Sequence, residues 1–197
     1  MYPLIVSFFT DDWEYPKHAA RLHAECDALR LDHRIERLES AGSYLANTCL
    51  KPRFIRNCLQ AGRPVLWIDV DGSIIKRPDF FIGSERDYDF QAKRITSKER
   101  TRMWHVGTMW FNPTPATFAF VDEWVARTGD MTDESALERT WRSREWNLRT
   151  REIPSTYFEI PYNRKPSPDC VIYHRISSSE SKKQQIKLAE QDEKLNG

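Results

Sequence analysis

The sequence lacks the features of a disulfide-stabilised, membrane-spanning or strongly charged protein. Its four cysteines (Cys26, Cys49, Cys58 and Cys170) form no CxxC pair, which favours reduced core thiols over disulfides or a zinc site. No segment approaches the roughly 18 apolar residues that span a bilayer, and no basic segment followed by a long apolar stretch opens the chain. With 30 lysines and arginines against 29 aspartates and glutamates, the net charge of +1 predicts no general attraction to nucleic acid or membranes. We therefore expect a soluble, cytoplasmic protein without a membrane partner.

Internal repeats and domain linkers are also missing from the sequence. A chain of 197 residues with 40% hydrophobic and 12% aromatic residues is long enough to build one proper core. We assign residues 1–180 to a single domain. Residues 181–197, which are almost entirely polar, are expected to form a C-terminal tail or a surface helix.

Strand-like and helix-like segments alternate along the first half of the chain. We expect strands at 3–10, 33–40 and 64–75, and helices at 11–30 and 47–62, with Asn47 or Thr48 as cap of the second helix and Gly62 as its stop. This β-α-β-α-β order implies parallel strands with right-handed crossovers, and ligands bind such sheets beyond the carboxyl ends of the strands.

The second half of the sequence is less regular but keeps the α/β character. Strands are predicted at 88–95, 105–112, 156–163 and 170–176, and helices at 115–128 and 134–146. We expect one mixed, mostly parallel sheet in a Rossmann-like arrangement, flanked by helices.

Two aspartates follow the buried strand "VLWI", in the stretch "VLWIDVDGSII". Residues i and i+2 of an extended backbone point to the same side, so Asp69 and Asp71 can face one ion, and Mg²⁺ or Mn²⁺ prefers such oxygen ligands. A second pair with the same spacing, Asp87 and Asp89, does not follow a buried strand, so the spacing alone has little value. An ordinary turn capped by aspartate is the alternative interpretation.

One family resemblance of this stretch is to the haloacid-dehalogenase-type phosphatases. Their first motif is a hydrophobic strand that ends in a similar loop, and the resemblance implies that Asp69 is a nucleophile. In that family the motif usually opens the catalytic core. Here about sixty residues of strand and helix precede it, which leaves the buried first strand without a role.

A resemblance that covers most of the chain is to the GT-A-type nucleotide-diphosphosugar glycosyltransferases. It is carried, in order, by "IVSFFT" with "DDW", by "NTCLKPRFIRNCLQAGRPVLWIDVDGSI", by "HVGTMWFNPTPATFAFVDEW", by "DESALERTW" and by "CVIYHRISSSESK". The resemblance implies a single-domain GT-A fold and transfer of a hexose or pentose from a nucleotide-diphosphate sugar, a UDP-sugar being one option. The chain is short for such an enzyme, so the acceptor side must be minimal.

Residue roles follow from this resemblance. Asp69, Asp71 and His174 would hold Mn²⁺ or Mg²⁺, which neutralises the charge on the leaving nucleoside diphosphate. The donor would contact Thr10, Asp11, Lys51, Arg53, Asp69, Gly107, Thr108 and Lys182. Asp133 and Glu134 are the candidates for activating the acceptor or supporting the positive charge on the sugar.

Local charge gives the only indication of the acceptor. Arginines alternate with tryptophans in "RTWRSREWNLRTR", and Trp104, Trp141, Arg142, Arg144 and Trp146 would suit a nucleic acid backbone with stacked bases. A modified base in DNA is therefore one candidate acceptor, and a glycan or small molecule is the other. The same residues also fit an ordinary solvated helix. An inactive protein that only binds a nucleotide-sugar or nucleic acid remains a third alternative.

Overall fold

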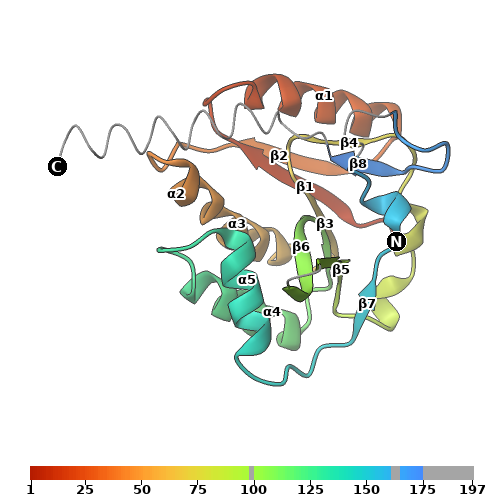
Figure 1. Cartoon of the computed structure of the whole chain (residues 1–197). Helices are drawn as coiled ribbons and strands as arrows, with labels where there is room; N and C mark the ends of the chain where they lie inside the picture. Colours follow the sequence, from red (N-terminus) through yellow and green to blue (C-terminus); the bar gives the residue numbers. More distant parts are fainter. Residues whose placement is uncertain (98–99, 161–164, 175–197) are drawn as a thin grey trace.

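Helices and strands alternate in the computed structural model, which describes residues 1–97, 100–160 and 165–174, the side chains of 95–97 and 100–103 excepted (Figure 1). The strands are β1 (Leu4–Phe9), β2 (His33–Arg37), β3 (Val65–Ile68), β4 (Gly72–Ile74), β5 (Phe90–Ser97), β6 (Arg100–Phe111), β7 (Thr150–Glu152) and β8 (Ile172–His174). The helices are α1 (Tyr15–Ala28), α2 (Tyr44–Thr48), α3 (Leu50–Leu59), α4 (Pro115–Ala126) and α5 (Asp133–Arg142). Three short 3₁₀ turns, η1 (Asp79–Phe81), η2 (Ser84–Arg86) and η3 (Ser155–Tyr157), lie between strands.

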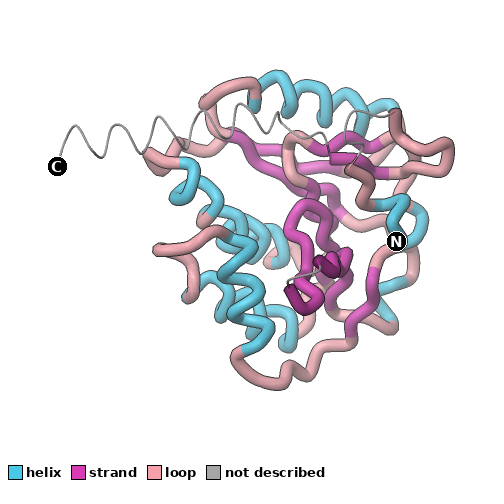
Figure 2. The backbone as a smooth tube through the Cα atoms, viewed as in Figure 1, coloured by secondary structure: helices cyan, strands magenta, loops and turns pink. Residues whose placement is uncertain are grey.

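A six-stranded sheet in the order β2-β1-β3-β6-β5-β7 forms the centre of the fold (Figure 2). The pairings β1–β2, β1–β3 and β5–β7 are parallel, while β3–β6 and β5–β6 are antiparallel. The expected mixed, mostly parallel sheet is therefore confirmed. A separate two-stranded sheet pairs β4 with β8 in antiparallel register.

Both faces of the central sheet are buried, as the continuous apolar runs of the sequence predict. Along β3, Val65 and Trp67 belong to the core shared with α3, α4 and α5, whereas Leu66 and Ile68 belong to the core shared with α1. Figure 1 shows α1 over one face of the sheet and α3, α4 and α5 over the other. This two-sided cover fixes β3 in register, so the residues that follow Ile68 are placed at the carboxyl edge of a rigid strand.

The predicted helix 47–62 is two helices, and its predicted cap is wrong. Ser43 caps the short α2 by accepting a bond from Ala46 N, and α3 then begins at Leu50 without a side-chain cap. Asn47 instead uses its side chain to tie two loops together, because it accepts from Ala41 N and donates to Asp12. The short polar side chain satisfies loop backbone rather than helix backbone. Gly62 does lie just beyond the end of α3, with a positive φ of 72°.

Several predicted strands differ from the structure. The predicted strand 64–75 is interrupted after Ile68 by the turn that carries Asp69 and Asp71, and it resumes as β4. In 156–163, η3 and a single bridge from Glu159 to Tyr173 replace the predicted strand, within the part of that segment that the structure describes. The three-residue strand β7 was not predicted, because "TRE" is polar and too short for a periodic pattern.

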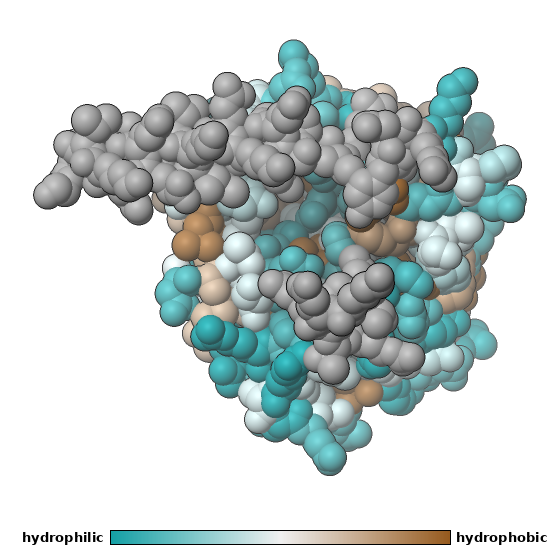
Figure 3. Space-filling view, in the orientation of Figure 1, coloured by the Kyte–Doolittle hydropathy of each residue, from teal (hydrophilic) through white to brown (hydrophobic). Residues whose placement is uncertain are grey.

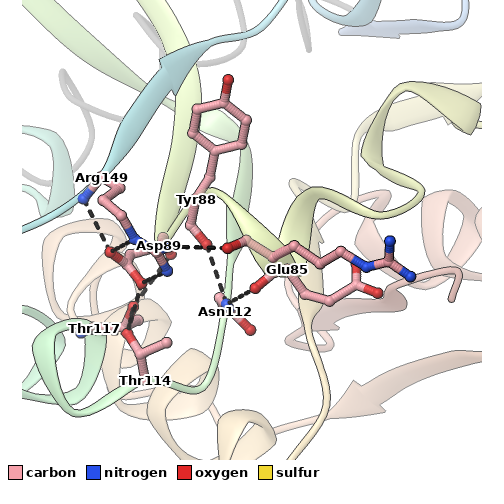
Figure 4. Close-up of polar contacts among 8 residues, drawn as sticks. Glu85, Tyr88, Asp89, Asn112, Thr114, Thr117 and Arg149 are labelled. Atoms are coloured by element: carbon pink, nitrogen blue, oxygen red, sulfur yellow. Dashed lines mark hydrogen bonds and ion pairs between the residues drawn. The ribbon is translucent and has the colours of Figure 1, made fainter.

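The second Asp-x-Asp pair belongs to a structural network (Figure 4). Asp89, at the start of β5, is 4% exposed, and its carboxylate accepts bonds from Thr114 Oγ1 at 3.0 Å and from both the backbone and the guanidinium of Arg149 at 2.9 to 3.0 Å. Asn112 donates to the backbone oxygens of Glu85 and Tyr88. These bonds join the start of β5, the N-terminus of α4 and the segment before β7.

All four cysteines are free thiols, and three of them are buried. Burial raises the pKa of Cys26 to about 12, that of Cys58 to about 11 and that of Cys170 to about 12, so these thiols stay protonated near neutral pH. Among the residues that the structure describes, no helix combines the length and the apolar character that crossing a membrane requires.

Candidate active site

Asp69 and Asp71 lie in a tight turn between β3 and β4. The turn is held because Asp69 N donates to Gly107 O at 2.8 Å and Gly72 N donates to Asp69 O at 2.7 Å. A Cβ atom at Gly72 would meet Ile68 Cγ2 at 2.7 Å and Asp69 O at 2.9 Å, so only glycine fits this close approach. The glycine of the Asp-x-Asp-Gly sequence is thus required by packing.

His174 is brought to the same place by the small sheet. In the β4–β8 pairing Gly72 lies opposite His174, which puts the last residue of β8 beside the turn. One ligand atom from each of Asp69, Asp71 and His174 lies within 4.8 Å of the others. Two carboxylates from the turn and an imidazole from β8 form a donor set that suits Mn²⁺ or Mg²⁺. The residues present therefore fit the divalent cation that the sequence implies.

Lys51 is buried at the back of this cluster and connects two carboxylates. Its Nζ lies 2.8 Å from Asp69 Oδ1 and also pairs with Asp133 Oδ2, while its side chain is only 8% exposed. The same Asp69 oxygen accepts a bond from Trp67 Nε1 at 2.9 Å. Burial lowers the pKa of Lys51, but the charges of Asp133 and Asp69 outweigh it, so this pKa is raised on balance.

The ionisation of Asp69 follows from the same contacts. Burial raises the pKa of Asp69, but the charges of Lys51 and His174 and the bonds from Lys51 and Trp67 lower it below its usual range on balance. The cluster combines the carboxyl groups of Asp69, Asp71 and Asp133 with the ammonium of Lys51 and the imidazole of His174. This predominance of carboxyl groups favours a cation.

Packing fixes the ring of His174. Its Nε2 lies 2.7 Å from Thr108 Oγ1, and Phe158 packs against its ring with centroids 4.7 Å apart. A Cβ atom at Gly107 would lie 2.9 Å from His174 Cε1 and 3.0 Å from His105 Cε1. The predicted Gly107 and Thr108 therefore lie at the cluster, where they hold the imidazole.

The remaining predicted donor residues are more dispersed. Thr10 is 3% exposed at the end of β1, and Asp11 is exposed and bonded to Arg37 Nε at 2.7 Å. Arg53 does not share the side of α3 that carries Lys51, since residues i and i+2 of a helix face different directions. It lines a surface pocket with Cys49 and Gly129. Lys182 lies outside the described residues.

Asp133 and Glu134 occupy the first turn of α5. Thr132 is the N-cap, and its side chain accepts a bond from Ser135 N. Carboxylates are favoured at this end of a helix because its backbone N–H groups are positive. Asp133 is buried against Lys51, whereas Glu134 is partly exposed. The two candidates therefore have different surroundings.

The predicted acceptor tryptophans contribute to the core. Trp104 is 3% exposed and packs edge-on against Trp141 at 5.2 Å, while Trp146 packs against Phe120 at 5.0 Å. Arg144 stacks on Trp146 at 3.9 Å, and Arg142 pairs with Glu138 one helical turn away. Core packing and surface pairing give these five residues structural roles, and their contact with an acceptor stays a prediction.

Tyr15, the first residue of α1, lies near the cluster and was not predicted as a site residue. Burial first, and then the charges of Tyr44, Asp71 and Asp69, raise the pKa of Tyr15. Only its place after the first buried strand hinted at the site. Two residues earlier, Trp13 is 52% exposed and has a φ of 68°, which is unusual for a bulky side chain.

Several solved structures with a similar fold are glycosyltransferases. The glycosyltransferase involved in glycosylation of the major capsid of PBCV-1 has a TM-score of 0.67 at 12% identity, over 91% of this chain and 96% of that one. The galactosyltransferase LgtC gives 0.54 at 12% identity, over 89% and 87%. Mouse xyloside xylosyltransferase 1 gives 0.55 at 10% identity, over 89% and 98%. The fold is therefore that of the GT-A glycosyltransferases.

The family is shown by a sequence model. The model of the nucleotide-diphospho-sugar transferases matches residues 11–185, and the chain belongs to this family. No curated protein sequence matches the chain. The enzyme class is thus glycosyltransferase, and the phosphatase interpretation of Asp69 is not supported.

Proposed function

We propose that the protein transfers a sugar from a nucleotide-diphosphate sugar in a reaction that depends on Mn²⁺ or Mg²⁺ bound to Asp69, Asp71 and His174. The observation that carries this proposal is the convergence of the three ligand atoms within 4.8 Å, two from the turn after β3 and one from β8, about a hundred residues later in the sequence. The catalytic domain would comprise residues 1–180, with 181–197 as a tail.

The contacts of Asp69 suggest that its two carboxylate oxygens have different roles. Lys51 and Trp67 both bond to Oδ1, which leaves Oδ2 for the cation. A cation in this position supplies neutralisation of the diphosphate charge as the glycosidic bond breaks. Lys51 itself is enclosed by two carboxylates, so we propose that it orients Asp69 instead of contacting the diphosphate. Thr10, Asp11, Arg53 and Lys182 remain the candidates for donor contacts.

The two acidic residues of α5 would then have separate tasks. Asp133 holds Lys51, and through it Asp69, so we propose that it is a positioning residue. Glu134 is partly exposed in the same helical turn. Its carboxylate is the candidate for supporting the positive charge that develops on the sugar or for accepting the proton of the acceptor.

For the acceptor we propose a glycan or a small molecule. The arginines and tryptophans that suggested a modified base in DNA are engaged in pairs and core contacts, including Arg142 with Glu138 and Trp104 with Trp141. With these residues engaged in other contacts, no feature of the described surface favours a nucleic acid as the acceptor. A UDP-sugar is the first donor to test.

Metal-dependent nucleotide binding tests the proposal. We expect Mn²⁺ to raise the affinity for uridine, guanosine or thymidine diphosphate in calorimetry, and Asp71→Ala to abolish that increase because one of three ligands is lost. The same ligand pair should raise the melting temperature of the native protein, since a ligand that binds only the folded state stabilises it.

Asp87→Ala is the matched control, because Asp87 is the exposed first member of the second Asp-x-Asp pair. It should bind Mn²⁺ and nucleotide as the wild type does. If the wild-type protein binds none of the three nucleotides more tightly with Mn²⁺, the proposed function is wrong.

A further inference from the structure

One arginine of α1 bonds to the backbone of the metal-binding turn. The Nη2 atom of Arg21 lies 3.4 Å from Val70 O, 3.1 Å from Asp71 O and 2.9 Å from Gly72 O. Its side chain is 20% exposed. Three consecutive carbonyl groups of the turn thus point toward one guanidinium, which comes from a helix about fifty residues earlier in the sequence.

A turn of this kind is stabilised by a positively charged hydrogen-bond donor. Carbonyl oxygens carry partial negative charge, and three that converge on one point repel one another unless a donor group lies between them. A guanidinium is planar, always charged and rich in donors, so it can serve several carbonyls at once. The Asp69–Gly72 turn therefore depends on Arg21 for its curvature as much as on its own bond from Gly72 N to Asp69 O.

A second residue of α1, Glu25, contacts both Arg21 and the strand β4 that follows the turn. Glu25 lies one helical turn after Arg21, with its Oε1 3.5 Å from Arg21 Nε. The other oxygen of Glu25 accepts a bond from Ile74 N at 2.9 Å. Arg21 and Glu25 together hold both the turn and β4 in place. The first residue of β4, Gly72, lies opposite His174 of β8. All three proposed metal ligands are thus connected to the same face of α1.

We propose that Arg21 is a positioning residue for the metal site. It holds the backbone that carries Asp71, so that the carboxylates of Asp69 and Asp71 face the same cation as His174. In this role Arg21 acts through the backbone of the turn and is not itself a ligand of the cation. This inference rests on the proposed function, because it requires that the cluster binds a divalent cation.

The sequence position of Arg21 gave no sign of this role. It lies on α1 among residues that alternate between buried and exposed, as a solvated arginine of an amphipathic helix would. The parallel β1–β3 pairing and the packing of α1 on β4 bring it to the turn.

Arg21→Met tests the inference, with Mn²⁺ as the probe. Methionine keeps the apolar stem and removes the donors. We expect the dissociation constant of Mn²⁺, measured by calorimetry with Mn²⁺ alone and with Mn²⁺ plus uridine diphosphate, to rise by about 10-fold or more, as is usual when a group that orients a metal ligand is lost. Arg21→Lys, which keeps the charge but offers a single ammonium, should give an intermediate loss.

Arg63→Met is the matched control. Arg63 is similarly buried, at 29% exposed, and it also bonds to one carboxylate and one backbone oxygen, those of Asp32 and Tyr2, away from the turn. The variant Arg63→Met should have a lower melting temperature but an unchanged affinity for Mn²⁺. This result would distinguish an effect on the position of the metal ligands from a general loss of stability.

Two outcomes would overturn the inference alone, and a third would overturn the proposed function together with the inference. If folded Arg21→Met binds Mn²⁺ within 2-fold of the wild type, Arg21 does not position the ligands. If Arg21→Met does not fold, Arg21→Lys decides, and wild-type affinity in that variant counts against the role of the three carbonyls. If the wild-type protein itself binds no Mn²⁺, the proposed function fails, and this inference fails with it.

Discussion

Lys51 lies between Asp69 and Asp133 with its side chain 8% exposed, so its charge is stabilised chiefly by ion pairing. Removing one partner of a buried ion pair leaves the other charge unpaired in a medium that solvates it poorly. We expect Lys51→Met to lower the free energy of unfolding by about 3 kcal/mol, measured by urea denaturation at neutral pH. The greater part of that loss comes from Asp133, because Asp69 retains more solvent contact and a bond from Trp67.

Two further variants check the origin of this loss. Lys93→Met breaks the more exposed pair with Glu152 and should cost about 1 kcal/mol at most. Asp133→Asn, added to Lys51→Met, should recover part of the stability because it removes the unpaired charge. If Lys51→Met proved as mild as Lys93→Met, the buried pairing of Lys51 would be refuted.

At the scale of elements, the Asp89 network joins the start of β5, the N-terminus of α4 and the segment before β7 (Figure 4). Burial raises the pKa of Asp89, but the bonds from Arg149 and Thr114 lower it below its usual range on balance. A depressed carboxyl pKa stabilises the fold above the unfolded value of about 3.9, and this stabilisation disappears as pH falls through the folded value.

Asp89→Asn should therefore show a stability loss that depends on pH. Near pH 7 we expect the variant to be about 2 kcal/mol less stable than the wild type, because hydrogen bonds to a charged acceptor are lost. The difference should shrink below about pH 4, where Asp89 becomes protonated in the unfolded and then in the folded state. Urea denaturation at pH 7, 5 and 3 measures it. A loss that is equal at all three values would mean that the charge of Asp89 contributes nothing.

At the scale of the whole molecule, positive and negative charges nearly cancel, with a net charge of +1. The face shown in Figure 3 is mostly hydrophilic, with small and separate apolar patches. Two of the arginines that the sequence groups near tryptophans pair with carboxylates in the structure, Arg149 with Asp89 and Arg142 with Glu138. Charges that are neutralised by neighbours release few counterions from a nucleic acid.

We therefore expect duplex and single-stranded DNA to bind weakly, with no saturation in fluorescence anisotropy at about 150 mM salt. Tight binding that weakens steeply as salt rises, and that Arg142→Glu with Arg144→Glu removes, would restore DNA as the acceptor. The double variant Lys17→Glu with Arg30→Glu changes two exposed cations outside this stretch and alters the net charge by the same amount, so it serves as the control for a nonspecific charge effect.

Much of the architecture was readable from the sequence because it depends on local patterns. The runs "LIVSFF" and "VLWI" have no polar face, so both had to be covered on two sides, and they became β1 and β3. The helices α1, α3 and α4 follow from their apolar spacing. Asp69 and Asp71 could be placed at the carboxyl edge of the sheet because they follow a buried strand, whereas Asp87 and Asp89 do not.

What the sequence left open depends on contacts between distant segments. The same spacing gives a candidate metal cluster at Asp69 and a structural ion pair at Asp89, and the structure shows the partners that belong to each, His174 and Arg149. Lys51 looked like a phosphate contact because a helix pattern does not show what its side chain meets.

Local composition thus determined the strands, the helices and the place of the aspartates along the chain. Tertiary structure decided which charges are paired, since burial makes an unpaired charge costly and its partners come from separate elements: α3 and α5 around Lys51, β8 beside the turn, and α1 behind it.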